Sequence, residues 1–294
     1  MKHSPTGALA KLIRRFTIMG KKYGVEWWIL VIGAIIILGI ILMAFFAGAI
    51  APFDPFDQNT GPQLAPPSSE HIMGTDNLQR DVYSRIIFGA RTILGVAILA
   101  AIISSLAGIT MGLISGFSGG VFDRVLSLIM DSVYSFPGLI LAIAFAAMLE
   151  PGIISITFAV AVIYIPTYFR LVRGQTLTIK EDLYVEAARA IGAPGITILW
   201  KYIFPNVIAT TAVVFTMNVG DAIMIEAALT YLGLGLPPSV VDWGMDLAMG
   251  KKFLPSGQWW LITFPGAMIS LLAVGFTMLG EGLSEILNPR LLER

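Results

Sequence analysis

Apolar residues gather in long uncharged runs along this chain and rarely alternate with polar residues. A helix needs about 20 mainly apolar residues to cross the ~30 Å hydrocarbon core of a bilayer. Runs of that size predict six membrane-spanning helices, at residues 27–50, 92–115, 125–149, 152–169, 207–231 and 259–280. The pattern therefore predicts an all-α, polytopic membrane protein with six transmembrane helices.

The composition agrees with these runs and excludes several classes of function. Apolar residues make up 56% of the chain and charged residues 13%, whereas about a quarter of a soluble domain is charged. Acidic and basic residues number 19 each, so the chain lacks the positive excess that nucleic-acid binding requires. Cysteine is absent, and the two histidines, His3 and His71, lie far apart in the sequence. We therefore predict no Cys- or His-rich metal site, no catalytic dyad that needs a Cys or a nearby His, and no nucleic-acid partner.

The distribution of lysine and arginine predicts the orientation, because short cytoplasmic loops retain these residues. If the N-terminus is cytoplasmic, 14 of the 19 basic residues fall on the cytoplasmic side. We therefore predict that both termini are cytoplasmic. A cleaved signal peptide is the alternative for the first run, because Ala47 and Ala49 resemble a cleavage site. The hydrophobic region of a signal peptide, however, has only about 7–15 residues.

Spans and loops together predict the organisation of the chain. Its parts are a cytoplasmic N-terminal segment 1–26, a first transmembrane helix 27–50, an external loop 51–91, a five-helix core 92–283 and a cytoplasmic tail 284–294. The external loop begins with several prolines, which favour extended backbone. An Asp81–Arg85 pair at i and i+4 then predicts an interfacial helix over residues 81–88. The inner loop 173–206 is too long for a simple connection, so we expect it to dock a partner.

Three carboxylates lie within the predicted spans: Asp131, Asp221 and Glu226. A charged acid in the membrane is costly, so each must face protein or water, be protonated, or pair with another group. Asp131 and Glu226 are close enough to the ends of their spans to reach an interface, whereas Asp221 is deeper. Asp221 and Asn218 are candidates for the wall of a translocation path. The alternatives for Asp221 are a structural hydrogen bond and a proton relay, which normally needs a chain of such groups.

Within the long inner loop, residues 181–193 predict a short helix. Acidic residues in its first turn suit the helix dipole, and Gly192 followed by Pro194 ends it. One face at i, i+3, i+4 and i+7 is formed by Tyr184, Ala187, Ala188 and Ile191. Periodicity alone leaves two alternatives open, a docking helix and an amphipathic helix on the membrane surface.

The stretch Glu-Ala-Ala-Arg-Ala-Ile-Gly at 186–192, followed by Phe-Pro-Asn at 204–206, resembles the Glu-Ala-Ala-x-x-x-Gly motif of ABC-importer permeases. Stretches at 71–91, 226–244 and 279–290 narrow the resemblance to the C-type permease of dipeptide, oligopeptide and nickel importers. Asp131 and Glu226 fall within patterns of that family, which favours a role in architecture for both. Gln79 departs from the family, which usually has glycine there.

The resemblance implies a type I ABC importer permease fold and a non-catalytic subunit that moves dipeptides or oligopeptides inward across a prokaryotic plasma or inner membrane. In the family the motif docks on an ATPase subunit, which implies docking residues Tyr184, Glu186, Ala187, Ala188, Ile191 and Gly192. The implied partners are a second homologous permease, two ATPase subunits and an extracytoplasmic solute-binding protein. ATP and Mg²⁺ would bind the ATPase subunits, so we expect no cofactor in this chain.

Other functions remain open at this level. Relatives of the resembled subfamily carry oligosaccharides or nickel chelates, and the sequence does not choose among these substrates. A proton-coupled secondary transporter that uses Asp221, and a structural membrane protein without a path, are alternatives from other classes.

Overall fold

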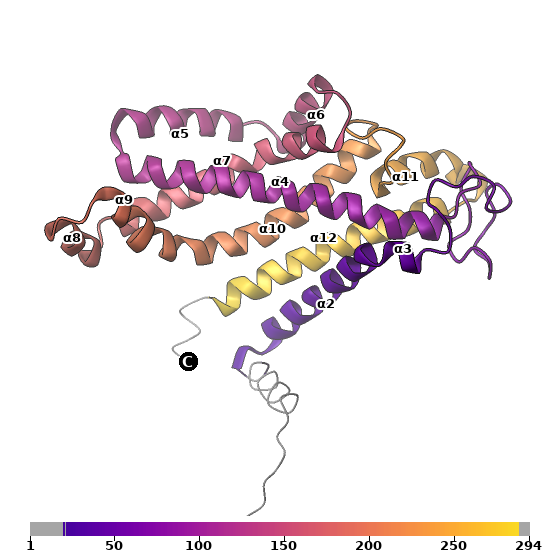
Figure 1. Cartoon of the computed structure of the whole chain (residues 1–294), viewed down its shortest axis with the longest axis horizontal. Coiled ribbons are helices and arrows are strands. Elements are labelled where there is room, and N and C mark those ends of the chain that lie inside the picture. Colours follow the sequence, from indigo (N-terminus) through magenta and orange to yellow (C-terminus); the bar gives the residue numbers. More distant parts are fainter. Residues whose placement is uncertain (1–19, 21, 288–294) are drawn as a thin grey trace, which may run out of the picture.

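The computed structural model describes residues 20 and 22–287 of the chain, and its long elements are all helices. The predicted segment 1–26 and tail 284–294 therefore lie largely outside the described residues. Within the described part, five helical stretches are long and apolar enough to cross a membrane. They are α2 (Val25–Phe45), α4 (Val82–Ser118), α7 (Ile153–Ile179), the stretch that ends in α10 (Phe204–Tyr231), and α12 (Trp260–Ile286). These helices lie roughly side by side (Figure 1), which confirms an all-α membrane fold.

The third predicted span is not one straight helix. It consists of α5 (Gly120–Tyr134) and α6 (Gly138–Met148), which are bent by 92° relative to each other. Pro137 precedes α6 and disfavours helical backbone at Phe136, so the helix breaks there. The prediction of a single helix over 125–149 is wrong, although the described chain still has six spans when the broken pair counts as one.

Three boundaries also differ from the predicted organisation. Residues 82–88, where a separate interfacial helix was expected, are the beginning of α4. Arg85 is buried in the protein, so this part of the helix does not lie on a lipid surface. The fourth span continues through Arg170 and Arg173 to Ile179, so the inner loop is shorter than 173–206. The last span reaches Ile286, three residues beyond the predicted end of the core.

Close packing of α4 against α7 organises the centre of the bundle. Gly108, Gly112 and Gly116 face α7, and a Cβ atom at each would lie only 2.5–2.9 Å from an α7 atom. Small residues spaced four apart allow helix backbones in a membrane to approach each other closely. The core continues through buried residues of α4, α7, α10 and α12, among them Ile93, Ala97, Val160, Ile223 and Leu272.

The first and last spans pack against each other in the same way. A Cβ atom at Gly33 of α2 would lie 2.7 Å from the carbonyl oxygen of Gly275 in α12, and one at Gly282 would lie 2.5 Å from Leu30. The described beginning of α2 and the described end of α12 therefore lie near each other (Figure 1).

Candidate functional site

A short helix, α8 (Leu183–Ala190), projects at one end of the bundle (Figure 1). It lies within the predicted 181–193 helix but is shorter. Gly192 has φ +83°, and the Ala193 amide donates a hydrogen bond to the Ala188 carbonyl at 3.0 Å. A left-handed glycine with this type of bond is a common helix C-terminus, so Gly192 ends the helix as the sequence indicated.

The predicted common face of α8 is divided in the structure. Ala188 is buried together with Val185, whereas Tyr184, Ala187 and Ile191 are exposed. Val185 was missed because the periodicity placed it beside the selected face. The buried side of α8 packs on a cluster that joins the nearby ends of α4, α7 and α10 (Leu113, Val172, Ile198, Leu199, Ile203 and Val207).

The outer side of α8 presents apolar side chains to the surroundings. Leu183 and Ile191 are each 83% exposed, and Glu186 is also exposed. The Tyr184 hydroxyl accepts a hydrogen bond of 3.1 Å from the amide nitrogen of Asn206, in the first turn of α10. This surface of α8 is therefore open while the helix itself is attached to a span.

The connection from α8 to α10 contains irregular helix. After α9 (Gly195–Thr197), the segment η1 (Ile198–Ile203) is a π-helix that leads directly into α10. Pro205 lacks an amide hydrogen and cannot complete a normal α-helical turn here. Because π-helical turns are often found at functional sites, this joint between α8 and α10 is part of the candidate site.

A partly buried ion pair holds three helices together at the same end of the bundle. Arg173 of α7 donates to both carboxylate oxygens of Asp123 in α5, at 2.6 and 2.7 Å. The Ser115 hydroxyl of α4 donates to the same carboxylate at 2.6 Å. The sequence analysis did not predict this cluster. The available signal was the position of Asp123 just before the apolar run 125–149 and of Arg173 just after the run 152–169.

A cavity of about 480 Å³ opens between the α5–α6 break, α7 and α10. It contains both candidate path residues, Asp221 and Asn218. Asp221 is exposed, and within the described part of the chain no hydrogen bond or ion pair holds its carboxylate. The alternative that Asp221 makes a structural hydrogen bond therefore finds no support in the described residues.

The other two intramembrane acids occupy different surroundings. Asp131 lies 3.3 Å from Arg170 in a half-exposed ion pair between α5 and α7. Glu226 is completely buried beside Asp242, so the expectation that Glu226 reaches an interface is wrong. The sequence did not reveal this burial, because Asp242 lies in a loop 16 positions further along the chain.

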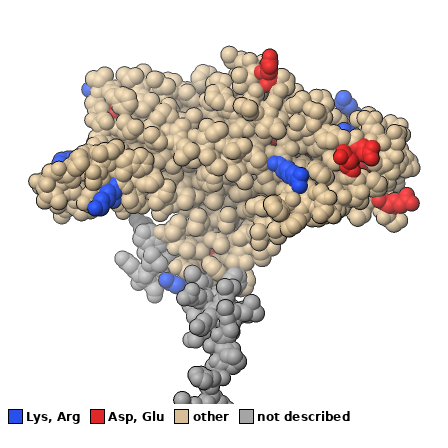
Figure 2. All heavy atoms as spheres, viewed as in Figure 1, with Lys and Arg blue, Asp and Glu red and all other residues tan. Residues whose placement is uncertain are grey.

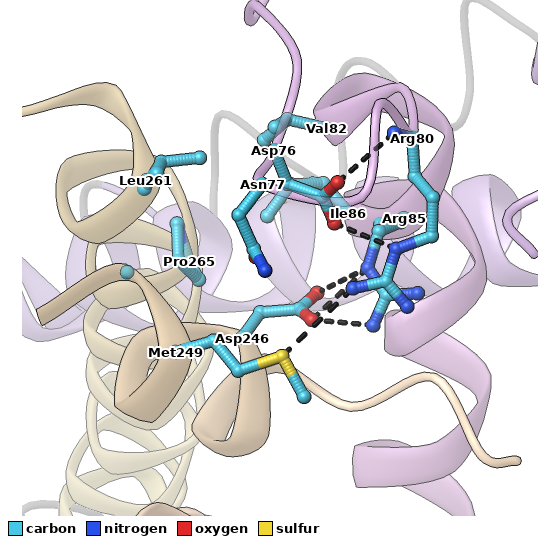
Figure 3. Close-up of a pocket in the computed structure, with 11 residues that line it drawn as sticks. Asp76, Asn77, Arg80, Val82, Arg85, Ile86, Asp246, Met249, Leu261 and Pro265 are labelled. Carbon is cyan, nitrogen blue, oxygen red and sulfur yellow. Dashed lines mark hydrogen bonds and ion pairs between the residues drawn. The ribbon is translucent and has the colours of Figure 1, made fainter. Parts of the chain in front are cut away.

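At the opposite end of the bundle, residues 51–81 fold into a cap without helices (Figure 1). Figure 3 shows Arg85 of α4 bonded to Asp246 of α11 (Trp243–Gly250), beside the pair formed by Arg80 and Asp76. Arg80 donates to Asp76 at 2.6 Å. Burial raises the pKa of the Asp246 carboxyl, and the Arg85 guanidinium acts in the opposite direction.

The cap uses residues of the 71–91 stretch. Asp81 accepts a hydrogen bond of 2.7 Å from the Ser84 amide and so caps the N-terminus of α4. Nδ1 of the buried His71 lies 2.9 Å from the other Asp81 carboxylate oxygen. Gln79 has φ +62°, a backbone conformation that favours glycine, so its departure from the resembled family falls at a strained position.

Charge is distributed along the bundle as a membrane requires. The middle of the visible face carries few charged residues, Lys and Arg show at both ends, and most of the acidic residues show toward the end opposite α8 (Figure 2). A bundle of membrane-spanning helices, with a cavity between them that contains an acid and an amide and with an exposed helix at one end, is the architecture of a membrane permease subunit. The chain belongs to the family described as the binding-protein-dependent transport system inner membrane component, which its residues 108–293 match.

A second match and several relatives agree with this family. Residues 29–67 match the N-terminal TM domain of oligopeptide transport permease C. The dipeptide transport system permease protein DppC of Alkalihalophilus pseudofirmus is 37% identical over 89% of this chain and 86% of its own length. The glutathione transport system permease protein GsiD of Pectobacterium atrosepticum is also 37% identical, over 89% of this chain and 87% of its own. The probable D,D-dipeptide transport system permease protein DdpC of Escherichia coli is 35% identical over 88% of this chain and 87% of its own length.

Proposed function

We propose that this chain is one permease subunit of an ATP-driven, binding-protein-dependent importer of dipeptides and oligopeptides. Its location would be a prokaryotic plasma or inner membrane, with both termini and α8 in the cytoplasm. Three relatives named as dipeptide, glutathione and D,D-dipeptide permeases support the substrate class. The distribution of basic residues, 14 of 19 on the side of the N-terminus, supports the orientation.

The exposed helix α8 is the observation that carries the proposal. Its outer residues, Leu183, Glu186, Ala187 and Ile191, form a surface on which an ATPase subunit docks. Its buried residue Val185 attaches that surface to the ends of three spans. Tyr184 adds a hydrogen bond to α10, so a displacement of α8 is transmitted to the helix that carries Asp221.

In this mechanism the chain performs no chemistry. Two separate ATPase subunits bind ATP and Mg²⁺ and move α8 as they close and open. A second, homologous permease completes the path, and an extracytoplasmic solute-binding protein delivers the peptide. Rigid-body movement of packed helices then alternates access between the two sides of the membrane. The close α4–α7 contact favours movement of these two helices as one unit.

The cavity disfavours a proton-coupled secondary transporter. A proton relay normally requires a chain of titratable acids or histidines. Among the described residues, Asp221 is the only acid or histidine that lines the cavity. Oligosaccharides and nickel chelates remain alternative substrates of the same class of transporter, although no residue of the cavity favours them.

Purification and reconstitution test the proposed function. The tagged chain is purified from its native membrane and then reconstituted, with the subunits that accompany it, into proteoliposomes. We expect ATPase subunits and a second permease to co-purify, and we expect dipeptide uptake to require ATP and a solute-binding protein. Uptake by the chain alone, driven by a proton gradient, would contradict the proposal.

A further inference from the structure

The cavity has the properties of a binding site for a small cationic group. Asp221 is the one charged residue among the described residues that line it. Its carboxylate is exposed and unpaired in the described part of the chain. An unpaired carboxylate at membrane depth is unfavourable, so a positively charged group that enters the cavity is stabilised there.

A second polar group lies one helical turn away. Asn218 is only 5% exposed, and its amide nitrogen has no hydrogen-bond partner within the described residues. Asn218 lines the same cavity as Asp221. The hydroxyl of Tyr168, which interacts with Asn218, is likewise buried without a hydrogen bond of normal geometry. The Asn218 amide nitrogen carries two N–H donors, and the neighbouring Tyr168 hydroxyl is an acceptor for one of them. Because buried donors are almost always bonded, the second N–H is available to a ligand in the cavity.

The spacing of the two groups defines the chemistry of the ligand. Residues three apart on α10 lie on the same face, about 4.5 Å apart along the helix axis. A carboxylate and an amide donor at this separation match two neighbouring groups of a peptide, its terminal α-ammonium and its first carbonyl oxygen. We propose that Asp221 and Asn218 form a subsite for the free amino terminus of the transported peptide.

The remaining walls suit side chains of varied size. Much of the lining is apolar, with Val133, Phe136, Leu141, Ile163 and Ile225 around the polar pair. Such walls impose little selection on peptide side chains, because they offer no charged or strongly directional partner. A cavity of about 480 Å³ is within the usual range of about 300–1,000 Å³ for small-ligand sites. The subsite therefore recognises the backbone of short peptides and rests on the proposed function as a peptide permease.

Protection of a cysteine in the cavity tests the subsite directly. The chain has no native cysteine, so Thr167→Cys provides a single reactive thiol in the cavity wall. The complete transporter is embedded in lipid nanodiscs, and dialanine is delivered by its solute-binding protein. We expect dialanine to slow labelling by a small thiol reagent about tenfold. Asp221→Asn should remove this protection, Asp221→Glu should restore most of it, and Asn218→Leu should weaken it.

Uptake provides the second measurement. We expect Asp221→Asn to lower the maximal rate of dialanine uptake about tenfold, equivalent to about 1.4 kcal/mol, with little change in the dialanine concentration that gives half-maximal rate. Glu150→Gln, which makes the same chemical change at an exposed acid outside the cavity, is the matched control and should transport normally.

The possible failures are distinguishable. If the wild-type complex imports dialanine and Asp221→Asn imports it equally well with full protection of the thiol, the subsite is wrong while the proposed function stands. A Thr167→Cys thiol that never reacts in the assembled complex also overturns the subsite, because the second permease then fills the cavity. Absence of ATP-dependent dialanine uptake by the wild-type complex overturns the proposed function, and the subsite with it.

Discussion

Arg85 and Asp246 form an ion pair that joins α4 to α11 across 161 positions of sequence. Both side chains are largely buried, with exposed fractions of 3% and 14%. A buried ion pair often contributes little compared with an apolar pair of similar volume, but loss of one partner leaves an uncompensated charge. The pair is therefore a sensitive point for the stability of the cap.

We expect Arg85→Met to destabilise the folded protein by about 3–5 kcal/mol, because Asp246 then remains buried without its cation. The double variant with Asp246→Leu should recover much of this loss, since no buried charge is left. Thermal denaturation of the purified protein in detergent measures both effects. Equal melting temperatures for Arg85→Met and the wild type would show that the pair does not support the fold.

At this scale, the sequence revealed residues whose type alone is unusual in its surroundings. Asp221 was found because it is an acid within an apolar run, and Gly192 because glycine and proline end helices. The ion pair of Asp123 could not be predicted from the sequence, because its partner is 50 positions away. The break in the sequence pattern after Phe169 also placed Arg173 outside the span to which it belongs.

At the scale of elements, α8 depends on its neighbours. Isolated helices shorter than about 12–15 residues are marginal in water, and α8 has 8 residues. The buried Val185 and Ala188 therefore supply packing that keeps it folded, and Val185 also connects it to the spans. The contacts that stabilise α8 are thus also the ones that the proposed mechanism uses to transmit movement.

Gly192→Val should weaken ATPase binding and uncouple ATP hydrolysis from uptake while the spans still assemble. The φ of +83° at Gly192 is unfavourable for residues with a Cβ, by about 1–2 kcal/mol, so the end of α8 must rearrange. Gly257→Val is the matched control, because Gly257 has φ +91° and open space around it but lies far from α8 in the sequence. Co-purification of the ATPase subunits and ATP hydrolysed per peptide transported measure the effect. Equal coupling in both variants would contradict the docking role of α8.

Glu186→Lys tests the same surface without changing backbone conformation. Glu186 is exposed in the first turn of α8, and its replacement reverses a charge at the proposed contact. We expect reduced ATPase co-purification with normal insertion of the chain, whereas Glu281→Lys, an exposed acid on α12, should have a smaller effect. Normal ATPase binding by Glu186→Lys would place the contact elsewhere.

The membrane-spanning character of the helices and their order were predictable, because apolar runs of about 20 residues rarely form anything other than membrane-spanning helices. The break between α5 and α6 was not predicted, since the run 125–149 has no charge at the break, although Pro137 was an available signal. The packing of α4 on α7 also had a signal, in glycines four apart at 108, 112 and 116.

The whole molecule has two unlike ends. The cap of residues 51–81 lies at one end and α8 at the other (Figure 1). Few charged residues occupy the face between them (Figure 2). Such a bundle crosses the membrane along its length, and the proposed orientation places the cap outside.

Single cysteines test this orientation without background labelling, because the chain contains no cysteine. Gln58 in the cap and Glu181 just before α8 are both exposed. A membrane-impermeant thiol reagent added to intact cells should label Gln58→Cys, and Glu181→Cys only after the membrane is permeabilised. The reverse pattern would invert the topology.

The cap also implies an order of events during biosynthesis. Its loop emerges early from the ribosome, yet the Trp260 indole, which donates to the Thr75 carbonyl at 3.2 Å, follows 185 residues later. Trp243, which donates to the Ile86 carbonyl at 2.9 Å, follows its acceptor by 157 residues. The nascent chain therefore holds an unfinished loop at residues 51–81 until its last helix has been inserted. Completion of the cap thus coincides with the end of insertion, and we expect nascent chains arrested before Trp243 to be more sensitive to proteolysis in this loop than the complete chain.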